Sequence, residues 1–123
     1  GRAGKVVNEE AGLSLDLAIP GSGAAGNNPE QLFAMGYAAC FDSALKLCAK
    51  KERSAMAGSR TTAAVGLGQL EGGGYGLDVE LRVAVKGLAQ AEAERLVALA
   101  HEVCPYSAAL KGNVAVRLLV SAE

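Results

Sequence analysis

Three cysteines are the side chains in this sequence best suited to chemistry, and their spacing divides them. Cys40 and Cys48 share one apolar segment, and in a helix their separation corresponds to about 12 Å along the axis. That distance is too long for a disulfide, so we interpret Cys48 as a small core residue. Cys104 comes directly before Pro105, at the end of a second helical pattern, where the backbone can shift.

Cys40 and Cys104 could act as a redox pair if the segments that carry them lie against each other. A thiol pair that opens and closes is what a thiol redox enzyme requires. The alternative is two buried cysteines that never meet, and the pattern alone leaves both possibilities open. A reactive Cys40 would need a lowered pKa, and the dipole of its own helix gives little help about ten residues from the N-terminus. A charge from elsewhere in the fold would have to activate it.

Glu30 is the charged residue that the apolar segment around Cys40 does not need for its core. Within one helix it would lie about 15 Å from Cys40 along the axis, so the two cannot touch. It could act through an arginine, or from the helix of a second subunit that lies antiparallel to the first. Composition does not choose among the candidate cations, which are Arg2, Arg53, Arg60, Arg82, Arg95 and Arg117.

Three other features give weaker signals. His101 is the only histidine, so neither a metal site nor a Cys-His dyad is indicated, and we expect it at the surface or at a helix cap. The glycine-rich "GGGYG" precedes a strand pattern rather than a helix, so it is not a phosphate-binding loop. We expect Asp42 to be solvated or to cap a loop.

The long apolar segment that carries Cys40 is predicted to be a central helix. Asn28 fits the N-cap, Pro29 fits the first turn, and Gln31 completes a capping box, with the helix extending to about Lys50. Apolar residues occupy most of its faces. One sheet covers only one side of such a helix, so a second subunit is the expected cover.

The remaining pattern predicts strands around two helices. A second helix is expected from about Gln90 to Cys104, ended by Pro105. Its buried stripe is predicted to be Leu96, Leu99, Ala100 and Val103. Strands are predicted at 6–7, 13–19, 61–70, 77–86 and 114–120, with "EGGGYG" as a hairpin turn between the third and the fourth. The fourth strand alternates, and the residues predicted to share its apolar face are Leu77, Val79, Leu81, Val83 and Val85. This order indicates an α+β layered fold rather than an alternating wound sheet.

Composition excludes several functional classes. The 123 residues suggest one domain, and a net charge of -1 without any basic run argues against binding to nucleic acid or anionic lipid. The longest apolar run, 32–41, is shorter than the roughly 20 residues that span a bilayer, and no signal peptide pattern occurs. Three cysteines without disulfide-scaffold spacing favour a reducing compartment. We therefore expect a cytoplasmic protein.

Two motifs, at matching separation, resemble one protein family. The stretches "NPEQLFAMGYAACF" at 28–41 and "VCPYSAALKGNV" at 103–114 are similar to the organic hydroperoxide resistance (Ohr) branch of the Ohr/OsmC superfamily of bacterial peroxidases. The similarity covers nearly the whole chain and includes the "GGGYGL" hairpin and the opening "GR". It implies a single domain over 1–123, with antiparallel sheets wrapped around a long central helix in an intertwined homodimer. The family has one more strand before "GR", and this sequence begins after it.

The resemblance also implies roles for four residues. Cys40 matches the peroxidatic cysteine and Cys104 the resolving cysteine. Arg2 matches the arginine that stabilises the thiolate and the peroxide, and Glu30 matches the carboxylate that orients this arginine. The implied reaction reduces organic and fatty-acid hydroperoxides to alcohols through a sulfenic acid on Cys40 and a Cys40–Cys104 disulfide. A lipoylated protein or another dithiol is the implied reductant, and no metal or organic cofactor is implied.

Apolar residues at the start of the central helix suggest a substrate class. Leu32, Phe33, Met35 and Tyr37 could hold an alkyl chain, so long-chain hydroperoxides should react faster than hydrogen peroxide. A non-catalytic dimer that binds a lipid or a small apolar ligand is the alternative function, and a structural dimer with inert thiols is a third. These alternatives differ in whether peroxide consumes a thiol and in how fast the thiols are labelled.

Overall fold

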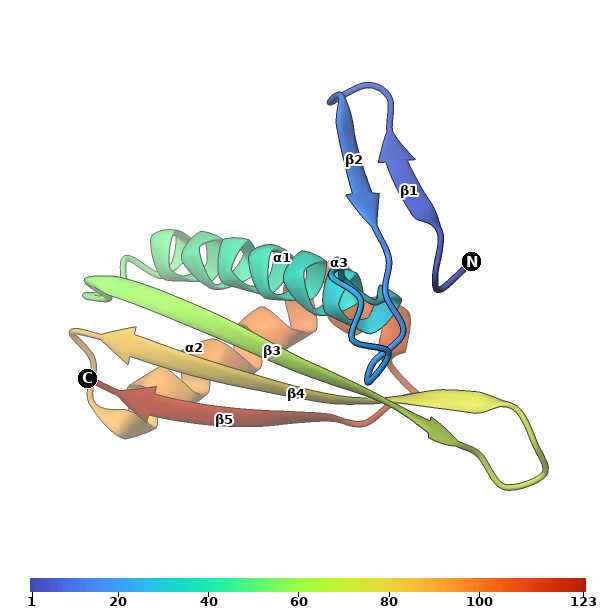
Figure 1. The fold of residues 1–123 in the computed structure, drawn as a ribbon. Coiled ribbons are helices and arrows are strands. Elements are labelled where there is room, and N and C mark those ends of the chain that lie inside the picture. The colour runs from blue at the N-terminus through green and yellow to red at the C-terminus, as the bar shows by residue number, and fades with distance from the viewer.

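Two helices cover one face of a three-stranded sheet, and a two-stranded hairpin projects away from both (Figure 1). The computed structural model describes residues 1–123. In chain order the elements are β1 (Lys5–Asn8), β2 (Leu13–Asp16), α1 (Pro29–Lys51), β3 (Gly58–Gln69), β4 (Tyr75–Lys86), α2 (Gln90–Val103), α3 (Pro105–Leu110) and β5 (Val116–Ala122).

Helix α1 begins as the capping pattern predicts. The Asn28 side chain accepts a hydrogen bond from the backbone N–H of Gln31 at 2.8 Å, and the Gln31 side chain accepts one from the backbone N–H of Asn28 at 2.9 Å. Pro29 occupies the first turn, where no backbone donor is missed. The helix continues to Lys51, one residue beyond the predicted end.

The three-stranded sheet has the order β3-β4-β5. Strands β3 and β4 form the predicted antiparallel hairpin, and its turn contains Gly72, Gly73 and Gly74, all with positive φ. Strand β5 pairs with β4 in parallel, while β1–β2 and β3–β4 are antiparallel. The parallel pairing follows from the connection, because α2 and α3 lie between the two strands and carry the chain back to the same end of the sheet.

The boundaries of several elements differ from the sequence expectation. Strand β3 starts at Gly58, before the predicted 61, and β2 stops at Asp16, before the predicted 19. Pro105 ends α2 as expected, but it also begins α3, which was not predicted. In the buried stripe of α2, Val103 is exposed and Leu99 only half-buried. Two other residues, Ala93 and Val97, complete the stripe beside Leu96 and Ala100.

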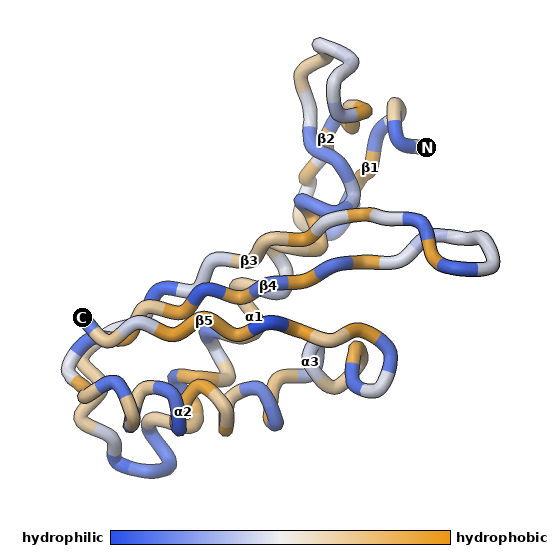
Figure 2. Tube along the Cα trace, turned by 90° about the horizontal axis from the view of Figure 1, so that it is seen from below, coloured by the Kyte–Doolittle hydropathy of each residue, from blue (hydrophilic) through white to orange (hydrophobic).

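The core lies between the helices and the sheet and contains 16 buried residues. Apolar and polar residues alternate along β4, as Figure 2 shows. Of its predicted apolar face, Val79, Leu81, Val83 and Val85 are buried in one core cluster with residues of α1 and α2, and Leu77 is half-buried at its edge. Cys48 is 3% exposed within this core, which confirms its interpretation as a core residue.

Helix α1 is the one helix long and apolar enough, by length and composition, to cross a membrane. The core helix of a globular protein meets the same criterion. Here α1 contributes Tyr37, Phe41, Leu45 and Cys48 to the core and lies against β3, α2 and α3. We therefore describe α1 as a core helix.

Candidate active site

The sulfur atoms of Cys40 and Cys104 lie 3.8 Å apart. Cys104 is fully buried, Cys40 is half-buried, and both are free thiols. A disulfide has an S–S distance of about 2.0 Å, so a local shift of less than 2 Å would join them. The expectation that these two cysteines could face each other is confirmed at the level of geometry.

Cys104 occupies the bend between α2 and α3. It caps the C-terminus of α2 and the N-terminus of α3, with an extended backbone at φ -64° and ψ 124°. The proline that follows disfavours helical backbone at Cys104, which explains why α2 stops there. The Cys104 N–H still donates to the carbonyl of Ala100 at 2.8 Å, so the bend is fixed to the last turn of α2.

The environment of Cys40 raises the pKa of its thiol. Burial is the largest cause, and the hydrogen bond with Cys104 and the charge of that second thiol add to it. Only the backbone N–H of Tyr106, in the first turn of α3, acts in the opposite direction. No cationic side chain of the chain contributes to the pKa of this thiol.

Arg2 and Glu30 form a two-point ion pair. The Arg2 guanidinium donates from Nη1 to Oε2 at 2.8 Å and from Nη2 to Oε1 at 2.6 Å. This hydrogen bonding is the main reason that the pKa of Glu30 is lowered and that of Arg2 raised. Glu30 is 9% exposed at the start of α1, and its two bonds to the more exposed Arg2 offset the cost of burying the carboxylate.

The structure brings the four predicted residues together as two separate pairs. Glu30 and Cys40 lie on the same helix, about 15 Å apart along its axis. No hydrogen bond or ion pair joins Arg2 to either thiol. The thiol pair is therefore complete within one chain, and the charged pair is formed at some distance from it.

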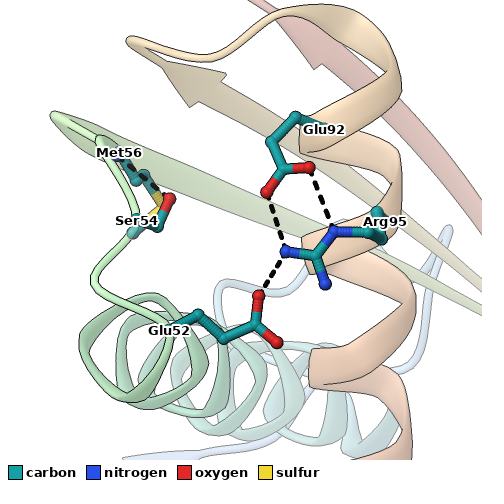
Figure 3. A network of polar contacts seen from close by, with 5 residues as sticks. All are labelled: Glu52, Ser54, Met56, Glu92 and Arg95. Carbon is teal, nitrogen blue, oxygen red and sulfur yellow. Dashed lines mark hydrogen bonds and ion pairs between the residues drawn. The ribbon is translucent and has the colours of Figure 1, made fainter.

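The other arginines with defined partners are engaged elsewhere. Arg95 of α2 bonds to Glu92 at 2.7 and 3.0 Å and reaches Glu52, just after α1, as Figure 3 shows. Glu52 lies about 18 Å from Cys40 along the direction of α1. The remaining pairs are Arg82 with Glu80, Arg117 with Asp78, and Arg60 with Glu123. Among the candidate cations, Arg2 is the one that meets Glu30.

Asp42 does not have the solvated or loop-capping position expected from the sequence. Its carboxylate accepts hydrogen bonds from Ser59 at 2.7 Å and from Thr61 at 3.3 Å, both on β3, and forms an ion pair with Lys46 at 2.7 Å. These bonds hold the pKa of Asp42 below its ordinary value against the opposing effect of burial. Asp42 thus joins α1 to the sheet, and only the i,i+4 spacing to Lys46 was a local signal for part of this role.

A second set of polar residues was not identified from the sequence. Ser107 of α3 is buried, and its Oγ lies 2.7 Å from the hydroxyl oxygen of Tyr37 and 2.8 Å from Nδ1 of His101. His101 lies half-buried in the last turn of α2, so the expected surface position is only partly correct and its contact with Ser107 was not anticipated. The Tyr37–Ser107 contact joins residues 70 positions apart, and the His101–Ser107 contact depends on the bend between α2 and α3, so sequence spacing gives no signal for either.

An open apolar groove of about 470 Å³ lies next to the thiol-bearing bend. It is lined by Phe33, Pro105, Tyr106, Ala109 and Leu110. Of the apolar residues predicted to hold an alkyl chain, Phe33 lines the groove and Tyr37 is buried behind it. The Phe33 ring lies 5.9 Å from that of Tyr106 and 6.1 Å from that of Tyr37. Of the other two, Leu32 is half-buried and Met35 exposed.

Comparisons with known proteins agree on one family. The model of the OsmC family, described as OsmC-like protein, matches residues 21–118. The organic hydroperoxide resistance protein of Xanthomonas axonopodis pv. citri is 45% identical, over 98% of this chain and 88% of that protein. OhrA of Bacillus subtilis is 49% identical, over 98% of this chain and 89% of that protein.

Solved structures give the same result. The crystal structure of an organic hydroperoxide resistance protein from Legionella pneumophila superposes with a TM-score of 0.92 at 48% identity, covering 98% of this chain and 90% of that one. The crystal structure of OhrB from Bacillus subtilis gives a TM-score of 0.91 at 42% identity, covering 98% and 92%.

Proposed function

Because this chain belongs to the OsmC-like protein family, in the branch of the organic hydroperoxide resistance proteins, we propose that it is a thiol-dependent peroxidase. Its reaction reduces organic and fatty-acid hydroperoxides to alcohols. The observation that carries the proposal is the 3.8 Å approach of the Cys40 and Cys104 sulfurs, inside a fold whose relatives are named for organic hydroperoxide resistance.

In the first step Cys40 acts as the peroxidatic residue. Its thiolate donates an electron pair to the terminal oxygen of the hydroperoxide, the O–O bond breaks, and the alkoxide takes up a proton and leaves as the alcohol. The sulfur is oxidised to a sulfenic acid. The half-buried position of Cys40 leaves it accessible to a substrate from one side, whereas Cys104 is fully buried.

In the second step Cys104 acts as the resolving residue. Its sulfur attacks the Cys40 sulfur, the S–O bond breaks, and the hydroxide leaves as water with the Cys104 proton. A disulfide between Cys40 and Cys104 results. A dithiol reductant of the lipoyl type then exchanges with this disulfide, returning both thiols and leaving the reductant as its own disulfide.

Arg2 and Glu30 are proposed to activate Cys40 across a homodimer. In one chain the charged pair lies too far along α1 to reach the thiol, and the Cys40 pKa is raised rather than lowered. An antiparallel arrangement of two α1 helices would place the pair of one copy over the thiol of the other. There the guanidinium would favour the thiolate and stabilise the developing alkoxide, while Glu30 fixes its direction.

Exposed apolar residues support such a dimer. The β1–β2 hairpin projects from the rest of the chain (Figure 1) and exposes Val6, Val7 and Leu13, which its own chain does not cover. Met35 on α1 is 54% exposed on the helix that was predicted to need cover from a second subunit. Cytoplasmic localisation is part of the same proposal, because three cysteines without disulfide-scaffold spacing favour a reducing compartment.

The substrate class is proposed from the apolar groove. Phe33, Tyr106 and Leu110 offer an apolar surface beside the thiol-bearing bend, which suits an alkyl chain better than a small polar peroxide. No cluster of His, Cys, Asp or Glu is placed to hold a metal ion, and in the proposed steps thiol sulfurs supply the electrons that reduce the peroxide.

The test is dithiol-driven turnover with matched peroxides. With dihydrolipoamide as reductant, kcat/KM should be higher for a fatty-acid hydroperoxide than for tert-butyl hydroperoxide, and lowest for hydrogen peroxide. Equal values for the three peroxides would contradict the role of the groove. Absence of any turnover, with tight binding of a fatty acid, would favour the alternative of a non-catalytic apolar-ligand-binding dimer, which the open groove also suits.

A further inference from the structure

A chain of hydrogen bonds connects the three elements that meet at the thiol centre. The hydroxyl of Tyr37 on α1 and the hydroxyl of Ser107 on α3 share a hydrogen bond of 2.7 Å. The same Ser107 oxygen lies 2.8 Å from Nδ1 of His101 on α2. Tyr37 and Ser107 are buried, and every buried side-chain nitrogen and oxygen atom in the structure has a partner.

Each of the three residues of this hydrogen-bond network lies at the same sequence distance from one of the two cysteines. His101 lies three residues before Cys104 and Ser107 lies three residues after it, so their contact braces the bend from both sides. Tyr37 lies three residues before Cys40 on α1, a spacing that puts the two side chains on neighbouring parts of one helix face. The brace therefore joins the backbone segments that carry both sulfurs.

The hydroxyl of Ser107 can bond to Tyr37 and His101 at the same time. A serine hydroxyl has one proton to donate and can accept further bonds, so it can serve one neighbour as donor and the other as acceptor. Loss of this hydroxyl would leave the buried Tyr37 hydroxyl and the His101 nitrogen without the partner they share, and a buried polar group without a partner is costly. The neighbouring segments would then have to rearrange.

We propose that His101, Ser107 and Tyr37 are positioning residues for disulfide formation, which hold Cys104 within reach of the oxidised Cys40. This inference rests on the proposed peroxidase function and concerns its second step alone. In that step a new S–S bond forms, the S–O bond of the sulfenic acid breaks, and hydroxide leaves with the Cys104 proton as water. The step requires the sulfurs to close from 3.8 Å to bonding distance, and holding reactants in place is a large contribution to the rate of such a step.

The experiment separates the two oxidation steps in time. The protein is mixed with one equivalent of tert-butyl hydroperoxide without reductant, quenched with acid at intervals and measured by mass. A gain of one oxygen reports the sulfenic acid, and a loss of two hydrogens reports the disulfide. In Ser107→Ala and His101→Phe we expect the disulfide step to slow about tenfold, while formation of the sulfenic acid changes by less than about twofold.

Two further variants distinguish positioning from general stability. His101→Asn keeps a polar atom near the place of Nδ1, so it should return the disulfide step to within about threefold of the wild-type rate. Tyr37→Phe keeps the buried ring and removes one hydroxyl, so it provides the test if Ser107→Ala does not fold. Its disulfide step should slow about threefold, because the contact between His101 and Ser107 remains.

Ser59→Ala is the matched control. It also removes a serine hydroxyl that makes a 2.7 Å bond to α1, in this case to Asp42, but at the sheet rather than at the bend. It should lower stability without changing the ratio of the two rates. An unchanged ratio in both His101→Phe and Tyr37→Phe, with wild-type protein forming the disulfide, would overturn the positioning role. If wild-type protein forms no disulfide at all, the proposed function fails instead.

Discussion

The thiol centre and the N-terminal region that carries Arg2 are built in opposite ways. Cys104 is fully buried, and α1, α2 and α3 of one chain surround it and Cys40. Arg2 precedes a hairpin that projects away from the fold, and its side chain is 44% exposed even though it is paired with a buried Glu30. The thiol pair is formed within the core of one chain, whereas Arg2 reaches Glu30 from an exposed position.

Under the proposed function, this difference means that one chemical step depends on contacts within one chain and the other on contacts between two chains. Formation of the disulfide needs only the two sulfurs that one chain already holds 3.8 Å apart. Activation of Cys40 needs a cation, and none of its own chain contributes to the pKa of this thiol. Under the proposed function, the second step depends on the internal core and the first step depends on assembly.

The largest expected effect comes from removing the sulfurs one at a time. Cys40→Ser should reduce dithiol-driven turnover to the background rate, because the atom that attacks the peroxide is gone. In Cys104→Ser, peroxide should still oxidise Cys40 once. Without a resolving thiol no internal disulfide should form, and Cys40 should accumulate as sulfenic and then sulfinic acid. Steady-state turnover and whole-protein mass after peroxide measure the two effects.

Cys48→Ser is the control for both variants, because Cys48 is a buried core thiol on the same helix. It should turn over at nearly the wild-type rate. Surviving turnover in Cys40→Ser would remove this residue from the centre of the reaction, and normal cycling of Cys104→Ser would make Cys104 structural.

A smaller effect is expected at the charged pair. Glu30→Gln keeps the shape of the side chain but removes the charge that holds the Arg2 guanidinium by two bonds. We expect kcat/KM for an organic hydroperoxide to fall about ten- to a hundredfold, since the charge-assisted bonds to the arginine that is proposed to activate Cys40 are weakened. The disulfide step in the quench experiment should be nearly unchanged. Equal slowing of both steps would contradict the division between the two regions.

The exposed surface pair of Asp78 and Arg117 provides the comparison for Glu30→Gln. It is also a two-point pair, but both side chains are more than half exposed and lie on the outer face of the sheet. Asp78→Asn should therefore leave kcat/KM within about twofold of the wild-type value.

The smallest expected effect is the dependence of stability on pH. The folded pKa of Glu30 is lowered, mainly by its bonds to Arg2, so the pair stabilises the fold fully above the unfolded value of about 4.3. That contribution is lost as the pH falls through the folded pKa. The difference in the free energy of unfolding between wild type and Glu30→Gln should shrink between pH 7 and pH 3, as urea titrations at each pH would measure. A difference that grows on acidification would contradict the assigned direction.

Local patterns were sufficient for the elements that frame the site. The capping box at Asn28, the glycine turn before β4 and the alternation along β4 each depend on neighbours within a few residues, and the structure confirms them. The approach of Cys40 and Cys104 could be expected only as one of two possibilities, because spacing in sequence does not determine which helices lie together.

Long-range contacts account for what the sequence did not reveal. Strand β5 lies parallel to β4 because of the path of the whole crossover, which no local signal in 116–122 encodes. Asp42 bonds to Ser59 on β3, 17 residues further along the chain. Ser107 bonds to Tyr37, 70 residues before it, and also contacts His101. Polar residues of these types are surface residues by default, and only the fold shows that they bond to one another at half-buried or buried positions.

The most direct test of the proposed Cys40–Cys104 cycle is a thiol map of the wild-type protein after one equivalent of an organic hydroperoxide, without reductant. Whole-protein mass gives the number of hydrogens lost, and a non-reducing peptide map identifies the linked residues. The proposed thiol cycle predicts the loss of two hydrogens within seconds, with Cys40 joined to Cys104 and Cys48 still free. An unchanged mass on that timescale, or a disulfide that includes Cys48, would contradict it.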